Sequence, residues 1–274
     1  MSQPPQIAGS QPPAAARVRD AIARAAQRTG VDFNYLLAQA RIESGLDPQA
    51  RAGTSSAAGL YQFTSGTWLA TLDRHGAQHG LGWADAAIEG GRVTDPALRG
   101  SVLALRHDPD IAALMAAELA GDNRDALAAT LGREPDAAEL YMAHFLGADG
   151  ASRFLSALAT NPDQSAAALM PQAAAANHGI FFDAGGSPRT VGGVMDLMRG
   201  KMAAAMGAPL PEGGYLPAAS APAFGGPVAQ EFNAAAAPMA RRPSMAETLR
   251  DTFAMGSAPD HVRAAYGKLQ AFGL

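Results

Sequence analysis

The stretch RIESGLDPQARAGTSSAAGLYQFTSGTW, residues 41–68, determines how we interpret this chain. It begins in the last turn of a helix predicted over residues 33–43. In that helix Leu36, Ala40 and Glu43 recur at i, i+4 and i+7, so they share one face. The stretch therefore places a carboxyl group on an apolar helix face, where a loop rich in glycine, serine and alanine begins.

A carboxyl group on an apolar helix face is costly to ionise, so it can keep its proton near neutral pH and donate it to a leaving group. The loop that follows adds the hydroxyls of Ser55 and Ser56 and then the aromatic rings of Tyr61 and Phe63. This combination favours a groove for an uncharged polymer. A glutamate near a helix C-terminus is more often a solvated surface residue, so the helix alone does not decide between the two interpretations.

The order of these residues resembles the first two motifs of the soluble (SLT-type), lysozyme-like lytic transglycosylases, in their bacterial and phage-associated variants. The matching residues are Glu43-Ser44, Asp47-Pro48 with Ala50, Gly59-Leu60-Tyr61-Gln62-Phe63, and Thr67-Trp68. A third family motif, Ala-Tyr-Asn-Ala-Gly, corresponds to residues 140–147 and retains Tyr141. Met142 stands there in place of Asn and His144 in place of Gly. The resemblance covers residues 15–160 and implies an all-α, lysozyme-like fold.

The resemblance implies a peptidoglycan lytic transglycosylase. Glu43 would protonate the β-1,4 glycosidic oxygen between N-acetylmuramic acid and N-acetylglucosamine. It would then accept a proton from the muramoyl C6 hydroxyl, which closes a 1,6-anhydro ring. The acetamido group of the substrate can stabilise the intermediate, as in substrate-assisted glycosidases. The implied substrate-binding residues are Ser44, Ser55, Ser56, Tyr61, Gln62, Phe63 and Tyr141.

Several of these residues have a plainer interpretation. Ser44 either bonds to Glu43 or only ends the helix, and Phe63 is expected in the helix core rather than on a ligand. The same holds for Trp68 and Trp83. His144 lies three residues after Tyr141, so it either borders the groove or serves the packing, and the packing role is the commoner one for a lone histidine.

Two other functions remain open at this stage. A muramidase would hydrolyse the same bond and would usually pair Glu43 with a second carboxylate, for which Asp47 and Asp73 are candidates that no spacing distinguishes. An assembly factor of a secretion or flagellar apparatus could instead keep the fold and bind peptidoglycan without turnover. The presence of Glu43 favours an enzyme over such a binding protein.

Composition excludes several other classes. The net charge of −4 and a pI of about 5.8 indicate no nucleic-acid partner, and no basic stretch indicates an anionic membrane surface. The sequence has no cysteine, no pair of histidines or carboxylates with metal-ligand spacing and no phosphate-binding glycine loop. No apolar run is long enough for a transmembrane helix. We therefore expect neither a metal nor a cofactor.

Composition also suggests domain boundaries. We expect a disordered N-terminus at 1–13, the lysozyme-like domain at 14–162 and a mostly helical or disordered C-terminal extension. Within that extension we predict a low-complexity linker at 163–243 with one short Met-rich helix, and a short helical segment at 244–274. Inside the domain, helices are predicted at 109–120 and 124–131, and the glycines of 77–94 leave room for a two-stranded hairpin.

The proposed substrate lies outside the cytoplasmic membrane, whereas residues 1–13 lack the basic and apolar regions of a signal peptide. We expect the protein to be cytoplasmic before export and to reach the periplasm or the cell exterior by a non-Sec route. A secretion or flagellar apparatus would be the partner in that export, or phage lysis would release the protein.

Overall fold

A computed structural model describes residues 14–53 and 55–208 of the chain. Helices account for most of these residues, with one two-stranded hairpin, which confirms the predicted all-α class. The predicted disordered N-terminus at 1–13 and the predicted helical segment at 244–274 lie outside the described residues. So does the part of the predicted linker from residue 209 onward.

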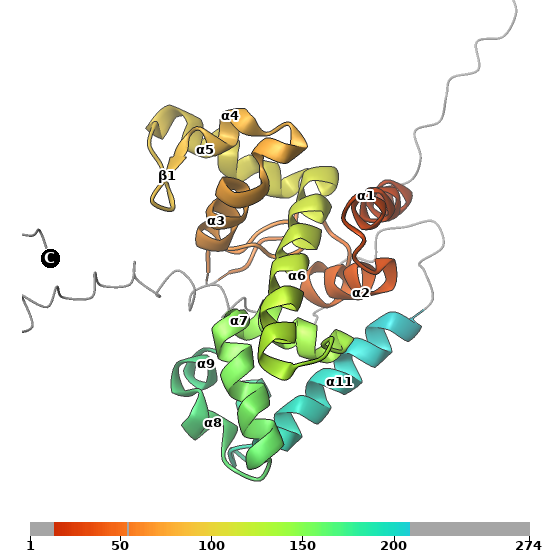
Figure 1. The fold of residues 1–274 in the computed structure, drawn as a ribbon, viewed down its shortest axis with the longest axis vertical. Helices are drawn as coiled ribbons and strands as arrows, with labels where there is room; N and C mark the ends of the chain where they lie inside the picture. The colour runs from red at the N-terminus through yellow and green to blue at the C-terminus, as the bar shows by residue number, and fades with distance from the viewer. Residues whose placement is uncertain (1–13, 54, 209–274) are drawn as a thin grey trace, which may run out of the picture. The chain divides into compact units, whose positions relative to one another are not determined.

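The order of the elements is shown in Figure 1. None of the helices within residues 14–208 has the length and apolar character that crossing a membrane requires. In chain order the elements are α1 (Ala14–Thr29), α2 (Phe33–Ser44), α3 (Ser65–His75), η1 (Ala77–His79), α4 (Gly82–Asp85), β1 (Ile88–Glu89), β2 (Arg92–Val93), α5 (Pro96–Ala104), η2 (Leu105–His107), α6 (Pro109–Leu131), α7 (Ala137–Thr160), α8 (Ala166–Leu169), α9 (Pro171–Ala176), α10 (His178–Phe181) and α11 (Val191–Gly207).

Helix α6 is the central element of the domain, and it packs against α1, α3 and α7 (Figure 1). Its buried face is rich in alanine, and small side chains let neighbouring helix axes approach closely. The buried alanines of α6 are Ala112, Ala113, Ala116, Ala117 and Ala120. Small side chains thus line the buried face of α6, while the largest fully buried side chains, among them Trp68, Phe63 and Phe154, come from other elements.

The sequence signals for helix starts are satisfied in the structure. Aspartate side chains accept hydrogen bonds from backbone N–H groups of the first turn in α2, α5, α6 and α7, which removes unpaired donors at those ends. The capping residues are Asp32, Asp95, Asp108 and Asp136. In α7 the side chain of Glu139 also accepts from the backbone N–H of Asp136, which completes a capping box.

One helix differs from its predicted extent. Residues 109–131 form one helix instead of the two predicted at 109–120 and 124–131, because the residues expected to interrupt it have partners in the fold. Asn123 is buried at 7% exposure, and Asp122 accepts hydrogen bonds from Arg74 and His75 of α3. Helix α7 is interrupted at Gly147, whose φ of 72° and ψ of 160° are not helical.

Residues 163–208 carry more helical structure than the one short Met-rich helix predicted within the linker. They carry helices α8 to α11, and α11 packs against both α7 and α2. The sparse apolar residues of α11 follow a helical spacing that collects them on one buried face, which a count of composition does not reveal. The buried residues of α11 are Val191, Val194, Met195, Met198 and Met202. Phe181 of α10 is also buried and stacks on Phe145 of α7, with ring centroids 6.4 Å apart.

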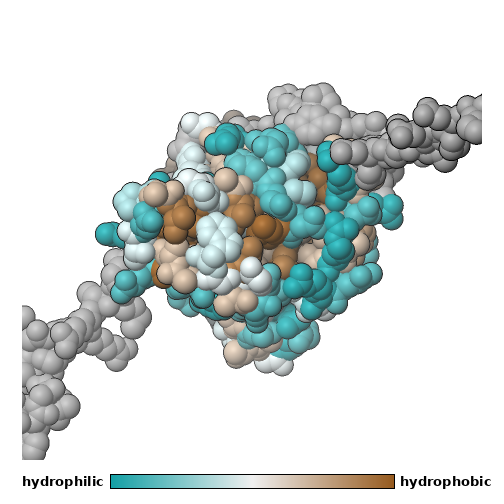
Figure 2. Space-filling model, turned by 90° about the horizontal axis from the view of Figure 1, so that it is seen from above, coloured by the Kyte–Doolittle hydropathy of each residue, from teal (hydrophilic) through white to brown (hydrophobic). Residues whose placement is uncertain are grey.

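The hairpin that the glycines of 77–94 left room for is present as antiparallel β1 and β2, with Ile88 opposite Val93. Trp83 of the preceding α4 corrects another expectation, because it is 46% exposed rather than part of the core. On the face seen from above, apolar residues gather in a small group bordered by polar ones (Figure 2). Near the hairpin in the sequence, Leu81, Val93 and Leu98 are only partly buried.

Candidate active site

Helix α2 holds Glu43 in its last turn, one residue before the helix ends. The side chain of Asp32 caps the start of α2 by accepting from the N–H of Tyr35, and Gly45 ends it in the left-handed conformation with a φ of 62°. Leu36 and Ala40 on the same face are fully buried, as the spacing predicted. The Glu43 side chain is only 4% exposed. The carboxyl group is therefore largely shielded from water while it lies beside the loop that follows α2.

Two groups from α7 contact the same oxygen of Glu43. The Tyr141 hydroxyl donates to Oε1 over 3.0 Å, and Nε2 of His144 lies 3.2 Å from that oxygen. Tyr141 and His144 are three residues apart on α7, so their rings lie on one face and stack with centroids 5.9 Å apart. The structure thus brings the predicted Tyr141 to Glu43, and it places His144 there as well, contrary to the packing role that we favoured.

A group of buried phenols surrounds this contact. Burial raises the pKa of Tyr141, and the charge of Glu43 and the hydrogen bond to it raise that pKa further. Burial, followed by the charge of Glu43, also raises the pKa of Tyr35 above its ordinary range. Burial and then Tyr35 do the same for Tyr61. All three rings therefore remain protonated at working pH, and Tyr141 stays a hydrogen-bond donor to Glu43.

Helix α11 brings a cation towards Glu43. Burial lowers the pKa of Lys201, and the charge of Glu43 raises it in part, which places the ammonium group within electrostatic range of the carboxyl group. The guanidinium of Arg41 donates to the carbonyl of Ala205 over 2.6 Å and so fixes α11 to α2 next to Glu43. No sequence signal identified Lys201, because its helix had been assigned to the predicted linker.

The loop from Gly45 to Thr64 is held by a buried arginine that sequence reasoning missed. Arg106 is 8% exposed, and its guanidinium donates to the carbonyls of Ser56 and Phe63 over 2.7 and 2.9 Å. Its Nε also donates to the carbonyl of Leu103 over 3.0 Å. Burial lowers the pKa of Arg106, followed by the effect of neighbouring cations. The only signal in the sequence was a charged residue directly after an apolar run.

Two predicted substrate-binding residues, Ser44 and Gln62, hold the loop instead. The Ser44 hydroxyl lies 3.1 and 2.8 Å from the carbonyls of Ala40 and Leu60, so it ties the loop to α2 rather than contacting Glu43. The side-chain amide of Gln62 donates to the carbonyl of Gly59 over 2.9 Å. That bond helps to hold the positive φ of 47° at Gln62, which is unusual for a residue other than glycine.

The two aromatic residues of the loop are core residues. Tyr61 is 0% and Phe63 is 1% exposed, so neither ring forms a groove wall as predicted. Phe63 packs edge-to-face on Trp68 with ring centroids 5.1 Å apart, and Trp68 is fully buried. This agrees with the core interpretation of Phe63 and Trp68. The Tyr61 hydroxyl is buried and has no hydrogen-bond partner within residues 14–53 and 55–208.

Ser55 and Ser56 remain accessible to a ligand. Ser55 is half-buried and Ser56 is exposed. Each hydroxyl oxygen accepts from a backbone N–H, Ser55 from Ala57 over 3.3 Å and Ser56 from Ser65 over 3.1 Å. A serine hydroxyl that accepts in this way can still donate its proton. Ser55 and Ser56 thus differ from Tyr61, Gln62 and Phe63, which are buried.

Gly59 meets two requirements that only glycine satisfies at once. Its φ is +81°, and a Cβ added there would lie 2.0 Å from the carbonyl oxygen of Arg106. We expect Gly59→Ala to lower the free energy of unfolding by about 3–5 kcal/mol, because strain and backbone overlap add together. Urea denaturation followed by circular dichroism measures this change. Gly121→Ala is the control, since nothing lies within 4 Å of that helical site, and it should be neutral or stabilising.

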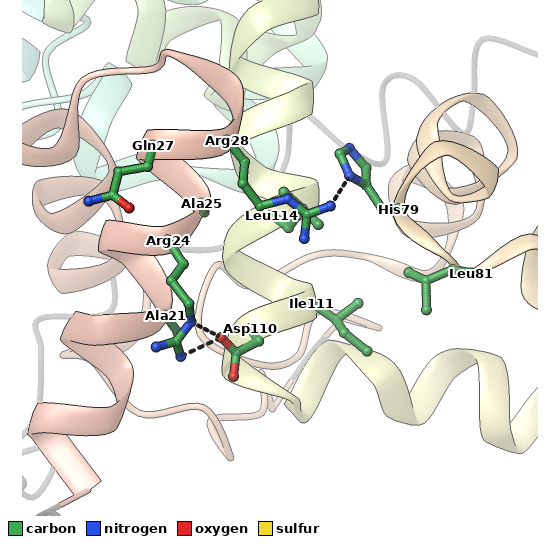
Figure 3. Close-up of a pocket in the computed structure, with 10 residues that line it drawn as sticks. All are labelled: Ala21, Arg24, Ala25, Gln27, Arg28, His79, Leu81, Asp110, Ile111 and Leu114. Carbon is green, nitrogen blue, oxygen red and sulfur yellow. Dashed lines mark hydrogen bonds and ion pairs between the residues drawn. The ribbon is translucent and has the colours of Figure 1, made fainter.

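A separate hollow lies between α1 and α6 and is not part of this site. Its volume is about 220 Å³, and Ala25, Leu81 and Leu114 line it together with two arginines (Figure 3). Arg24 donates to Asp110 and Arg28 to His79, as the dashed lines in Figure 3 show. None of the groups that contact Glu43 lines this hollow. Its cations are already neutralised or engaged, so it does not compete with Glu43 as the candidate active site.

Residues 20–79 match the family model of the transglycosylase SLT domain. Over these residues the match confirms the resemblance to the soluble lytic transglycosylases that the motifs indicated. The match supports, in general terms, a glycan-cleaving activity of the lytic transglycosylase type. It covers Glu43 and the loop but ends before α7, so the roles of Tyr141 and His144 rest on their contacts in the fold.

Proposed function

We propose that this protein cleaves the β-1,4 bond between N-acetylmuramic acid and N-acetylglucosamine in peptidoglycan and leaves a 1,6-anhydro end. The observation that carries the proposal is the shielded carboxyl group of Glu43, which accepts a hydrogen bond from Tyr141 within a domain of the SLT type. Peptidoglycan glycan strands are the substrate. Ser55 and Ser56 are the residues of the loop best placed to bond sugar hydroxyls.

The chemistry requires one carboxyl group acting twice. Glu43 donates its proton to the glycosidic oxygen as the bond from that oxygen to C1 of the muramoyl residue breaks, while the acetamido oxygen of the substrate bonds to C1. The Glu43 carboxylate then takes the proton of the C6 hydroxyl, whose oxygen displaces the acetamido group from C1. Glu43 ends protonated again and no water is consumed, so one group serves as acid and then as base.

The surroundings of the other two candidate carboxylates support a single catalytic carboxyl group. Asp47 takes part in the turn after α2, where its Oδ1 accepts from the backbone N–H of Gln49 over 2.7 Å. Asp73 is an exposed residue of α3. A hydrolase with a pair of carboxylates would need one of them across the scissile bond from Glu43. This favours the transglycosylase over the muramidase that the sequence left open.

Mass spectrometry of the products tests this proposal directly. Purified peptidoglycan incubated with the protein should release muropeptides that are lighter by one water than those of a hydrolase. Borohydride should leave these ends unchanged, because an anhydro end has no open-chain aldehyde. Products that borohydride reduces would identify a muramidase, and binding without any release would identify a non-catalytic peptidoglycan-binding factor.

The proposed substrate also defines where the protein acts. Since peptidoglycan lies outside the cytoplasmic membrane, we place the activity in the periplasm or at the cell exterior, in local wall remodelling or lysis. Delivery by a secretion or flagellar apparatus is part of the proposal. Fractionation of cells with and without such an apparatus tests it, and a protein that stays in the cytosol in both would contradict it.

A further inference from the structure

The contact between His144 and Glu43 goes beyond what the proposed reaction requires. His144 is 6% exposed, and its side chain and that of Glu43 are each 4% exposed, so water competes little for this contact. The imidazole comes from the second turn of α7, and the carboxyl group comes from the last turn of α2. Stacking on Tyr141 fixes the plane of the imidazole ring. The orientation of His144 is therefore set by the fold.

Chemistry determines which tautomer suits this geometry. A carboxylate oxygen accepts hydrogen bonds only, so an imidazole nitrogen 3.2 Å from it is attractive when that nitrogen carries the proton. Oε1 then accepts from the Tyr141 hydroxyl, and a proton on Nε2 of His144 would lie against the same oxygen. The hydrogen bond from Tyr141 and the close approach of His144 together restrict the rotation of the carboxyl group, and both favour the negative charge that appears when it gives up its proton.

We propose that His144 is a positioning residue that, together with Tyr141, holds Oε1 of Glu43, so that Oε2 is the oxygen that gives and takes the proton. This inference rests on the proposed function of Glu43 as acid and base. His144 acts through Glu43 and does not itself touch the substrate. The titratable groups that interact electrostatically with Glu43 are Tyr35 of α2, Tyr141 of α7 and Lys201 of α11.

Replacement of His144 by Gln and by Leu separates a hydrogen-bond donor from simple packing. Gln offers an amide N–H near the position of Nε2, whereas Leu fills a similar volume without a donor. On soluble, uncrosslinked glycan strands we expect His144→Gln to retain kcat within about threefold, whereas His144→Leu should lose about 10- to 100-fold in kcat with KM nearly unchanged. The control is His178→Gln, which alters an exposed histidine of α10 and should leave both constants unchanged.

Imidazole NMR gives a readout that does not depend on turnover. In ¹⁵N-labelled protein, the resonances of His144 are assigned by their loss in His144→Gln, among the six histidines of the chain. We expect the Nε2–H tautomer in the wild type, and a change of its resonances in Glu43→Met, which removes the acceptor. The Nδ1–H tautomer, or equal activity of His144→Leu and the wild type, would overturn the inference.

The two readouts distinguish the failure of this inference from that of the proposed function. If the wild type releases no product but shows the Nε2–H tautomer and its response to Glu43→Met, then His144 does hold the Glu43 carboxyl group and the proposed function is wrong. If the wild type is active and both His144 variants match it, the proposed function holds and the positioning role is wrong. If both variants lose activity equally while remaining folded, His144 serves packing and not hydrogen bonding, which also overturns the inference.

Discussion

Glu43→Gln is expected to lower the release of soluble muropeptides from purified peptidoglycan by roughly 10³- to 10⁴-fold, in the upper part of the range for loss of one acid–base group. The effect is large because the same carboxyl group must act in both half-reactions. Gln keeps an oxygen that can accept from Tyr141 and has nearly the same volume, so the packing at the end of α2 should persist. The loss should therefore appear in kcat and not in binding.

Two controls make this result specific. Glu89→Gln changes an exposed glutamate of β1 and should release product at the wild-type rate. Co-sedimentation with insoluble peptidoglycan should show that Glu43→Gln binds as much as the wild type. If Glu43→Gln retained more than about a tenth of wild-type turnover, its assignment as acid and base would be wrong, because an amide cannot donate a proton to a glycosidic oxygen.

The position of Glu43 could be predicted because its determinants are local. A capped helix start, a spacing of i, i+4 and i+7 and a glycine at the helix end all lie within a few residues of each other, and local sequence controls each of them. The contact of Glu43 with Tyr141 joins residues 98 positions apart. Tyr141 could be predicted only from the resemblance to the third motif. The spacing of three residues then indicated that His144 lies on the same helix face as Tyr141, but it did not decide the role of His144.

The errors of prediction also have a physical origin. Burial depends on which helix covers a side chain, and a one-dimensional pattern does not report this. Tyr61 and Phe63 are enclosed by the fold of the loop, whereas Trp83, on a four-residue helix, remains exposed. Within residues 163–243 only one short Met-rich helix is predicted, because alanine, glycine and proline dominate the rest. The few large apolar residues of that helix nevertheless suffice to bury one face of α11.

The second large effect that we expect concerns α11 and the neighbouring α10. Met195→Ala should lower the free energy of unfolding by about 2–5 kcal/mol, and Phe181→Ala by about 3–5 kcal/mol, because each empties a fully buried site. Thermal unfolding by circular dichroism should show melting temperatures lowered by about 4–20 °C for a domain of this size. A linker would tolerate both changes, since a side chain without packing partners loses nothing when it is shortened.

Met206→Ala is the matched control, because Met206 lies on the same helix but is 41% exposed. It should melt within about 2 °C of the wild type, since surface substitutions usually change stability by less than 0.5 kcal/mol in either direction.

Activity gives a second test of the role of α11, because Arg41 bonds to the carbonyl of Ala205 and Lys201 lies within electrostatic range of Glu43. Well below its melting temperature, Met195→Ala should therefore still lose activity relative to Met206→Ala. If Met195→Ala and Met206→Ala melted alike, α11 would not belong to the folded core, because loss of a buried side chain from a core helix must lower stability. Such a helix would not support the active site either.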